Sequence, residues 1–379
     1  MKKTELNNPE TKKPEIKKTE APRLMIDPLE TWGIKIKEKL IIAGPCSAES
    51  EKQVLETAMR LAKHGVHIFR AGIWKPRTRP NSFEGVGSVG LAWLKKARLA
   101  SGLPVAVEVA RPEHVRDCLK HNVDVLWIGA RTTANPFSVQ AIADALRGVD
   151  IPVLVKNPVN PDVELWMGAI ERLSQAGIKK IAAIHRGFSS FKKNEYRNTP
   201  HWEIAIELRR KWPNLPILCD PSHICGNREL TPLISQIAMD LLMDGLMIES
   251  HIRPETALSD AEQQLRPDRV GELIHSLRFK KEFPSAPESH LELEALREEI
   301  DEIDLQLLNL LGKRMKLSRH IGEKKRKEKM SILQPRRWKH IVENRVQAGE
   351  KKALSETFVF RLFQEIHKES IRNQRLGDQ

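Results

Sequence analysis

Residues that could bind anions or activate a substrate recur at the ends of short apolar runs in the first two thirds of the chain. The eight runs cover residues 39–44, 67–72, 104–109, 125–130, 152–156, 178–184, 216–221 and 245–250. At or just after their ends stand, in order, Cys46, Arg70, Glu108, Arg131, Lys156, Arg186, Asp220 with His223, and Glu249. Cations gathered at one place repel one another and require an anionic ligand, and Arg and Lys suit phosphate and carboxylate oxygens.

A second group could hold a metal ion. Cys46, His223, Glu249 and Asp260 offer a thiolate, an imidazole and two carboxylates, a set that suits Mn, Fe, Co or Zn better than Ca or Mg. These residues stand far apart in the sequence, so only a closed sheet, with its last strand beside its first, would bring them together. Four cysteines are too few to staple 379 residues, which favours thiol or metal chemistry over disulfides.

The apolar runs must be the elements that position these groups. They are apolar on both faces and are separated by stretches with helical spacing, which is typical of buried parallel strands. Eight strand–helix units predict an α/β fold, a (β/α)8 TIM barrel, with an open doubly wound sheet as the alternative. In a barrel, the carboxyl ends of all eight strands share one face, where catalytic groups collect.

Composition divides the chain into four parts. We expect an N-terminal mobile extension at 1–38, the barrel at 39–277, a linker at 278–290 and a small all-α helical domain at 291–379. In the last part, apolar residues spaced by three and four predict a long helix that packs against another helix: Leu293, Leu296, Ile300, Ile303, Leu307 and Leu310. Pro335 ends that region, and further helices are expected at about 336–348 and 355–375. Three such helices bury little alone, so a homodimer through this domain is expected.

Charge and hydropathy exclude several other classes of function. The net charge is +13, but the excess is spread along the chain, and the basic run 324–329 lacks aromatic residues for base stacking, so no nucleic-acid partner is expected. No apolar run is long enough to span a membrane. The Lys/Glu-rich N-terminus lacks the apolar block of a signal peptide, which predicts a cytoplasmic protein.

Seven short motifs of the first part resemble those of 3-deoxy-D-arabino-heptulosonate 7-phosphate (DAHP) synthase, over residues 39 to about 277. They are Gly44-Pro45-Cys46-Ser47, Arg70-Ala71-Gly72, Lys75-Pro76-Arg77-Thr78, Gly129-Ala130-Arg131, His185-Arg186-Gly187, Asp220-Pro221-Ser222-His223 and Leu258-Ser259-Asp260. The resemblance implies condensation of phosphoenolpyruvate with erythrose 4-phosphate, the first step of the shikimate pathway. The sharpest alternative is 3-deoxy-octulosonate 8-phosphate synthase, which uses arabinose 5-phosphate and typically reads Lys-Ala-Asn at Lys75.

The resemblance also implies roles for residues. Arg131, Lys156 and Arg186 would bind the phosphate of phosphoenolpyruvate, Arg70 and Lys75 would surround its carboxylate and reacting carbons, and Arg77 and Thr78 would take erythrose 4-phosphate. A divalent metal, Mn first with Fe, Co or Zn as alternatives, would be held by Cys46, His223, Glu249 and Asp260 and would polarise the aldehyde. The catalytic candidates are Lys75, Glu108 and His185. Glu108 would handle the attacking water, or else would form an ion pair with Arg or Lys. His185 would carry a proton, or else would be an oriented core histidine.

The last part resembles the all-α class of chorismate mutase over roughly 291–376. The resemblance lies in Ala295-Leu296-Arg297, Lys313-Arg314, Gly322 through Lys325, Arg337, and Ser370 with Gln374. Arg314 and Lys325 are three helical turns apart and therefore share a face. By this resemblance, Arg297 of one subunit and Arg314 with Arg337 would bind the carboxylates of chorismate, while Lys325 and Gln374 would donate to its ether oxygen. The rearrangement to prephenate needs only positioning and charge stabilisation.

One departure from that class concerns the start of the second helix. Trp338 follows Gln334-Pro335-Arg336-Arg337, where the class often carries an acidic cluster with a Glu that contacts the substrate hydroxyl. This leaves two alternatives open: an active mutase, or a helical domain that mainly senses chorismate or prephenate and dimerises. The basic run 324–329 could also be a solvated helix face. Because early and late steps are joined in one chain, we hypothesise that a ligand of the helical domain regulates the barrel.

Overall fold

The computed structural model describes residues 24–75, 83–191, 195–280 and 287–375. The chain divides into two compact units, Met1–Lys281 and Glu282–Gln379, and each is described by itself. Within the described ranges, no helix is both long and apolar enough to cross a membrane.

The first unit is a closed barrel of eight parallel strands, which confirms the predicted (β/α)8 fold. The strands are β1 (Leu40–Gly44), β2 (Ile68–Ala71), β3 (Val105–Val109), β4 (Val125–Ile128), β5 (Val153–Lys156), β6 (Ile181–His185), β7 (Ile217–Cys219) and β8 (Gly245–Glu249). Each strand pairs with the next, and β8 pairs with β1, in register from Leu40 with Gly245 to Gly44 with Glu249. Every predicted apolar run therefore coincides with one strand, although β6 extends one residue beyond its run, to His185. The open-sheet alternative is wrong.

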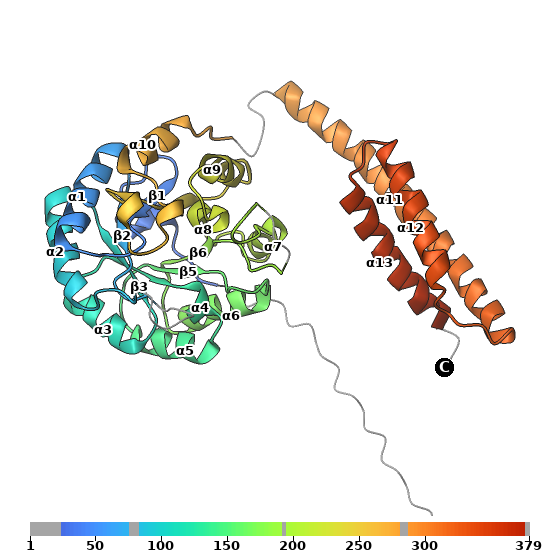
Figure 1. Ribbon diagram of the computed structural model, residues 1–379, viewed down its shortest axis with the longest axis horizontal. Coiled ribbons are helices and arrows are strands. Elements are labelled where there is room, and N and C mark those ends of the chain that lie inside the picture. Colours follow the sequence, from blue (N-terminus) through green and yellow to red (C-terminus); the bar gives the residue numbers. More distant parts are fainter. Residues whose placement is uncertain (1–23, 76–82, 192–194, 281–286, 376–379) are drawn as a thin grey trace, which may run out of the picture. The chain divides into compact units, whose positions relative to one another are not determined.

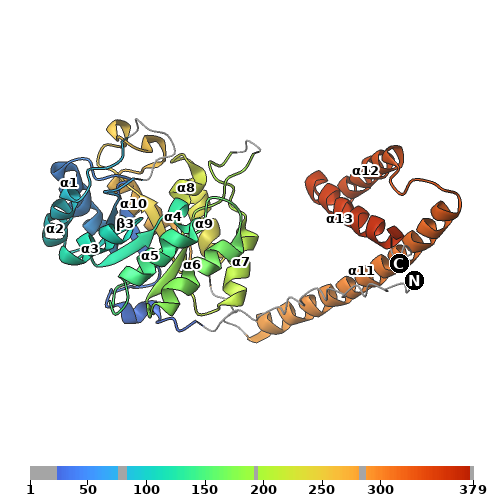
Figure 2. The same ribbon diagram turned by 90° about the horizontal axis from the view of Figure 1, so that it is seen from below.

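Helices surround the strands on the outside, as Figures 1 and 2 show. The outer helices are α1 (Glu51–Leu61), α2 (Val89–Ser101), α3 (Pro112–Lys120), α5 (Pro136–Ala145), α6 (Val163–Gln175), α7 (Trp202–Lys211), α9 (Thr231–Asp240) and α10 (Pro267–Ser276). Short helices α4 (Ala130–Thr133) and α8 (Pro221–Cys225) follow β4 and β7 directly. Several outer helices begin at proline, whose missing N–H costs nothing in the first turn.

Alternation along the strands divides the apolar residues between two cores. One residue of each pair packs against the helices, and the other fills the barrel interior, as Ile42, Ile68, Trp127, Leu154, Ile184, Leu218 and Met247 do. This division explains why the strands are apolar on both faces. The next inward position, two residues later, is polar at or just after the end of six strands: Arg70, Glu108, Lys156, Arg186, Asp220 and Glu249.

Part of the expected N-terminal extension is packed on the barrel. A 3-10 helix, η1 (Leu29–Trp32), buries Leu29 and Trp32 against the inner core, with Ile34 and Ile36 beside them. The backbone N–H of Asp27 donates to Lys179 O, just before β6, so this segment covers the amino ends of the strands. Residues 24–38 of the expected extension 1–38 are therefore ordered against the barrel, because their apolar side chains cover its amino end. Residues 1–23 lie outside the described residues.

The second unit consists of three helices, as predicted: α11 (Pro287–Lys327), α12 (Pro335–Glu350) and α13 (Glu356–Arg375). Helix α11 begins inside the expected linker, 278–290, of which residues 281–286 are not described. Helix α13 packs against α11 and α12. At Gly322 of α11 a Cβ atom would lie 2.6 Å from Gln374 O, so glycine allows α13 to approach closely. The apolar row from Leu293 to Leu310 remains 39–60% exposed.

Candidate active sites

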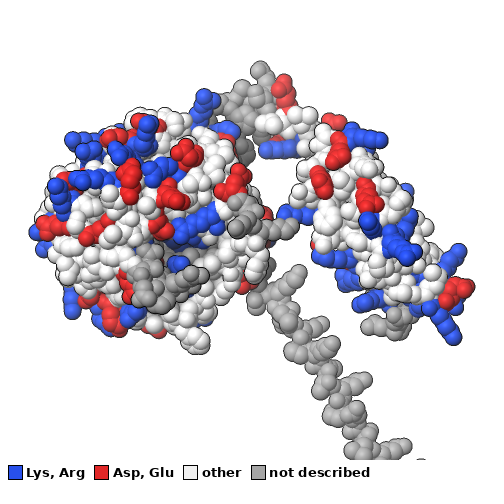
Figure 3. Space-filling model, in the orientation of Figure 1, with Lys and Arg blue, Asp and Glu red and all other residues white. Residues whose placement is uncertain are grey.

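The carboxyl ends of the barrel strands gather most of the predicted charged residues at one mouth. Five of them are buried there, at inward positions at or just after the ends of five different strands: Arg70, Lys156, Arg186, Asp220 and Glu249. At the surface of the barrel unit in Figure 3, Lys and Arg are interspersed with Asp and Glu. These five charged side chains differ from those surface groups because they are buried.

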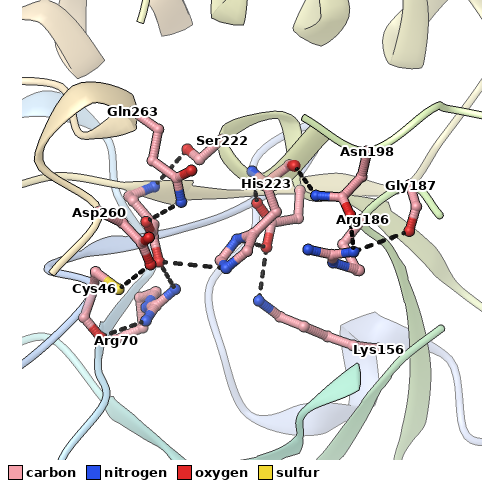
Figure 4. A network of polar contacts seen from close by, with 12 residues as sticks. Cys46, Arg70, Lys156, Arg186, Gly187, Asn198, Ser222, His223, Asp260 and Gln263 are labelled. Atoms are coloured by element: carbon pink, nitrogen blue, oxygen red, sulfur yellow. Dashed lines mark hydrogen bonds and ion pairs between the residues drawn. The ribbon is translucent and has the colours of Figure 1, made fainter. Parts of the chain in front are cut away.

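Three of the four expected metal ligands converge closely, and the fourth lies beside them. Cys46, Glu249 and Asp260 each offer a ligand atom, and these atoms lie within 4.8 Å of one another. His223 Nε2 lies 3.8 Å from Glu249 Oε1, while its Nδ1 lies 2.8 Å from Asp220 Oδ2 (Figure 4). A carboxylate at Nδ1 leaves Nε2 facing the other ligands, which is how second-shell carboxylates orient metal-binding histidines. The donor set fits a divalent transition metal.

Electrostatics show which of these groups would change on binding a cation. Burial, with the nearby Glu249 carboxylate, raises the pKa of the Cys46 thiol to about 12. Burial alone would raise the pKa of Asp260, but Arg197 and His223 outweigh it and lower the pKa below its usual value. Without a cation the thiol therefore keeps its proton, whereas a coordinated metal would displace it.

Cations surround the ligand group. Arg70 Nη1 donates to Glu249 Oε1 at 3.1 Å and Nη2 to Cys46 O at 3.2 Å, and the guanidinium lies 4.7 Å from the centre of the Trp127 ring. Lys75 Nζ donates to both Cys46 O and Cys46 Sγ at 3.0 Å. The structure thus places Arg70 and Lys75 directly against predicted metal ligands.

The two other buried cations at the mouth are held by polar partners. Lys156 Nζ donates to Asp220 Oδ2 at 2.7 Å, and Arg186 Nη1 donates to Asn198 Oδ1 at 2.7 Å (Figure 4). Burial lowers the pKa of Arg186 to about 10, and Asp220 partly offsets that effect. Asp220 contacts both Lys156 and His223, so it joins the cationic part of the mouth to the metal-ligand part.

Two further predicted residues border the same mouth. Arg131 is exposed on α4, and its charge also lowers the pKa of Arg186. Glu108 packs so closely against Gly129 that a Cβ there would collide with its carboxylate. Burial, the largest effect, lowers the pKa of Lys75. Interactions with Cys46 and then with Glu108 raise it, so the pKa of Lys75 ends above its usual value. Arg77 and Thr78 lie outside the described residues.

His185 does not face the mouth, which corrects its assignment as a proton carrier. It is fully buried on β6, one residue before the inward Arg186, and therefore points toward the helix layer. Its ring centre lies 5.0 Å from that of Trp202 and 5.8 Å from that of Phe188. Burial and the Arg186 charge lower its pKa to about 3, so the imidazole is neutral. The alternative of an oriented core histidine describes it better.

The helical unit brings together four predicted residues where α11 meets α13. Arg314 Nη1 donates to Ser370 Oγ, and Lys325 Nζ donates to Ile332 O at 2.7 Å. Ser370 and Gln374 are buried on α13. Trp338 of α12 stacks on His367 of α13, with ring centres 4.2 Å apart and planes 16° apart.

Arg297 and Arg337 are exposed. At about 1.5 Å per residue, Arg297 lies about 25 Å along α11 from Arg314, and its guanidinium pairs with Glu294 instead. A single copy of this unit therefore cannot bring Arg297 to Arg314.

Comparison with known proteins shows which families the two units resemble. Residues 33–282, well over half of the chain, match the DAHP synthetase I family. The chain belongs to that family. Residues 296–375 match the chorismate mutase type II family. The chain is therefore an enzyme that joins a DAHP synthase domain to a chorismate mutase domain.

Three comparisons show how similar this DAHP synthetase I family member is to individual proteins. The phospho-2-dehydro-3-deoxyheptonate aldolase of Thermotoga maritima is 36% identical over 238 residues, which are 63% of this chain and 68% of the relative. A crystal structure of a DAHP synthase from the same organism has a TM-score of 0.58 at 33% identity, covering 65% of this chain and 70% of that one. A 2-dehydro-3-deoxyphosphooctonate aldolase of Nitratidesulfovibrio vulgaris is 28% identical over 262 residues, 63% of this chain and 90% of the relative.

Sequence reasoning missed several residues that support the DAHP synthase site. Gln263 Nε2 donates to Glu249 Oε2 at 2.7 Å, and Arg197 Nη1 donates to Asp260 Oδ1 at 2.9 Å. Gln264 Oε1 accepts from the Cys46 backbone N–H at 3.0 Å, while its Nε2 donates to Ser259 O at 2.8 Å. Gln263 and Gln264 stand three and four residues after Asp260, and this closeness in the sequence could have indicated them. No feature of the sequence indicated Arg197.

Proposed function

We propose that the barrel unit condenses phosphoenolpyruvate with erythrose 4-phosphate to DAHP, and that the helical unit rearranges chorismate to prephenate. The observation that carries the first half is the meeting of buried Arg70, Lys156 and Arg186 with the Cys46, Glu249 and Asp260 donor atoms at one barrel mouth. Phosphorylated carboxylates match such cations, and an aldehyde oxygen matches the adjacent metal-ligand group. The cytoplasmic location expected from the sequence belongs to the same proposal.

In this proposal Lys156 and Arg186, with Arg131 at the rim, bind the phosphate of phosphoenolpyruvate. Asp220 and Asn198 already hold the first two side chains, so little rotamer freedom remains to be lost when the phosphate binds. Each charge-assisted hydrogen bond contributes roughly 1.5–3 kcal/mol. Arg70 and Lys75 face the carboxylate and the reacting carbons, while Arg77 and Thr78 take the aldose phosphate.

Cys46, His223, Glu249 and Asp260 would hold the divalent metal, with Mn proposed first and Fe, Co or Zn as alternatives. When bound there, such an ion supplies Lewis-acid polarisation of the aldehyde oxygen. Arg70 and Gln263 keep the Glu249 carboxylate oriented, and Arg197 does the same for Asp260. These contacts fix the ligands before the substrates arrive.

The proposed reaction forms one carbon–carbon bond. The enol carbon of phosphoenolpyruvate attacks the aldehyde carbon, whose oxygen takes the electron pair and a proton. Water adds to the resulting cationic carbon and loses a proton. The carbon–oxygen bond to phosphate then breaks, and the new hydroxyl gives its proton to the departing phosphate as it becomes the ketone oxygen. Glu108 is the candidate to accept the water proton, because it faces the mouth from β3 close to Lys75.

The chorismate mutase half is proposed to act as a homodimer. The row Leu293, Leu296, Ile300, Ile303, Leu307 and Leu310 is largely exposed in one copy, although its spacing is that of a helix–helix seam. A second copy covering this row would also supply Arg297, which its own subunit holds about 25 Å from Arg314. Arg314 and Arg337 would then bind carboxylates together with the second copy's Arg297, and Lys325 and Gln374 would donate to the ether oxygen.

Consumption of phosphoenolpyruvate tests the barrel half. Purified protein is supplied with erythrose 4-phosphate or arabinose 5-phosphate, each with a chelator and with added Mn²⁺. Metal-dependent turnover of the four-carbon aldose supports the proposal. Preference for arabinose 5-phosphate would favour the second candidate, an octulosonate-type synthase, which the similarity to the N. vulgaris relative keeps open.

Chorismate disappearance tests the helical half. Conversion to prephenate supports the mutase, whereas tight prephenate binding without turnover would favour the sensing and dimerising alternative. We also propose that a ligand of the helical unit regulates the barrel. An unchanged synthase rate across prephenate concentrations, with equal prephenate affinity in the presence and absence of barrel substrates, would refute that regulation.

A further inference from the structure

The helical unit contains two buried polar atoms that have no hydrogen-bond partner within the described part of the chain. They are His367 Nε2 and Gln374 Oε1, both on α13. Seven residues separate them, which is about two helical turns, so they share one face with Ser370 between them. That face meets Arg314 and Lys325 of α11, since Arg314 donates to Ser370 and both cations act on His367.

Leaving such atoms unpaired is costly. A buried donor or acceptor without a partner has lost its hydrogen bonds to water and gained none in return, so native structures rarely keep one without a reason. Gln374 already has a proposed role in ligand binding. His367 has none, and its unpaired nitrogen lies among the residues of the same site.

The orientation of His367 is fixed by its neighbour on α12. The Trp338 ring stacks on the imidazole with centres 4.2 Å apart and planes 16° apart. A stacked ring can rotate little, so the direction of Nε2 is fixed relative to the neighbouring Arg314 and Lys325. Trp338 thereby acts as a positioning residue at the place where the sequence departs from the mutase pattern.

The charge state of His367 defines what it can bind. Burial lowers its pKa, and the Arg314 and Lys325 charges lower it further, so the imidazole is neutral at neutral pH. A neutral imidazole donates a hydrogen bond at one nitrogen and accepts at the other, and it carries no charge that would draw a carboxylate away from the two cations. Its natural partner is an uncharged oxygen, such as a hydroxyl group, on a ligand whose carboxylates the arginines hold.

We infer that His367 Nε2 hydrogen-bonds an uncharged oxygen of the carboxylate ligand bound beside Arg314 and Lys325, with Trp338 holding its ring. This inference rests on the proposed function, because it takes that ligand to be a hydroxyl-bearing cyclic dicarboxylate of the chorismate or prephenate kind. It adds a ligand contact from α13, two turns from Gln374.

Two substitutions test the contact in the full-length protein. His367→Leu removes both ring nitrogens, and His367→Phe also keeps a ring to stack on Trp338. Prephenate affinity is measured by calorimetry, mutase kcat/KM by chorismate disappearance, and unliganded stability by the melting temperature. His340→Leu on α12 is the matched control, since His340 is exposed and contacts Asn344.

We expect both His367 variants to bind prephenate about tenfold more weakly and to lose a similar factor in kcat/KM. Their unliganded melting temperatures should not fall, because an unpaired polar atom has been removed, and His340→Leu should match the parent protein. Unchanged prephenate affinity in both folded variants would overturn the inference, as would a lowered melting temperature with unchanged affinity, which marks a structural histidine. Failure of the parent protein both to bind prephenate and to convert chorismate would instead overturn the proposed mutase function, and the inference with it.

Discussion

Replacement of Gln264 by leucine is expected to loosen the predicted metal site and to destabilise the barrel. The Gln264 side chain is fully buried, and its carboxamide connects two loops: Oε1 accepts from the Cys46 N–H at 3.0 Å, and Nε2 donates to Ser259 O at 2.8 Å. Ser259 precedes Asp260, whose backbone is left-handed with φ 49°. A non-glycine residue in that region is uncommon and needs support from its surroundings.

The magnitude follows from the two groups that leucine would leave unpaired. Each orphaned buried backbone group costs about 1–3 kcal/mol, and leucine returns part of that through apolar burial, so we expect a net loss of about 3 kcal/mol. For a unit of this size that is a fall in melting temperature of about 6–12 °C. Because neighbouring contacts orient the ligands, metal affinity should fall about 10- to 100-fold.

Circular dichroism melts in the presence of chelator and titration with Co²⁺, followed by its thiolate charge-transfer absorption, measure the two effects separately. Gln236→Leu is the matched control. Gln236 Nε2 donates to Arg278 O and its Oε1 accepts from Arg278 N, both at 3.0 Å, but at a partly exposed position where water can replace it. A Gln264→Leu protein that melts and binds Co²⁺ like the Gln236→Leu protein would refute the reasoning.

Three further outcomes are expected. Cys46→Ala should abolish tight metal binding and synthase turnover but leave chorismate conversion unchanged; full metal retention in an elemental assay would remove Cys46 from the ligand set. Arg314→Ala should lower mutase kcat/KM at least tenfold without affecting phosphoenolpyruvate consumption, and an equal mutase rate would favour the solvated basic face. Trp32→Ala should lower the free energy of unfolding of the barrel by roughly 3–5 kcal/mol in urea unfolding, because it leaves a cavity in the inner core at the amino ends of the strands. A loss below about 1 kcal/mol would contradict the packing described for 24–38.

Much of the barrel could be predicted because strand alternation is a local property. Runs apolar on both faces indicated all eight strands, and the polar residues at or just after the ends of the runs indicated the mouth. The same two-residue period, counted from Ile184, places Arg186 inside the barrel and His185 outside it. The choice between a proton carrier and a core histidine, left open for His185, could therefore have been made from the sequence.

Local patterns in the sequence are sufficient for the set of elements and the chemical types at their ends: eight buried strands, three amphipathic helices, and cations with metal-binding groups at defined positions. Which of these groups meet depends on how the elements pack. Closure of β8 onto β1 brings Gln264 to the backbone N–H of Cys46 and Asp260 to the Cys46 thiol across more than 200 residues of chain, and no local pattern encodes such a pairing. The burial of Trp32 and the stacking of Trp338 on His367 likewise depend on surfaces that exist only after the chain has folded.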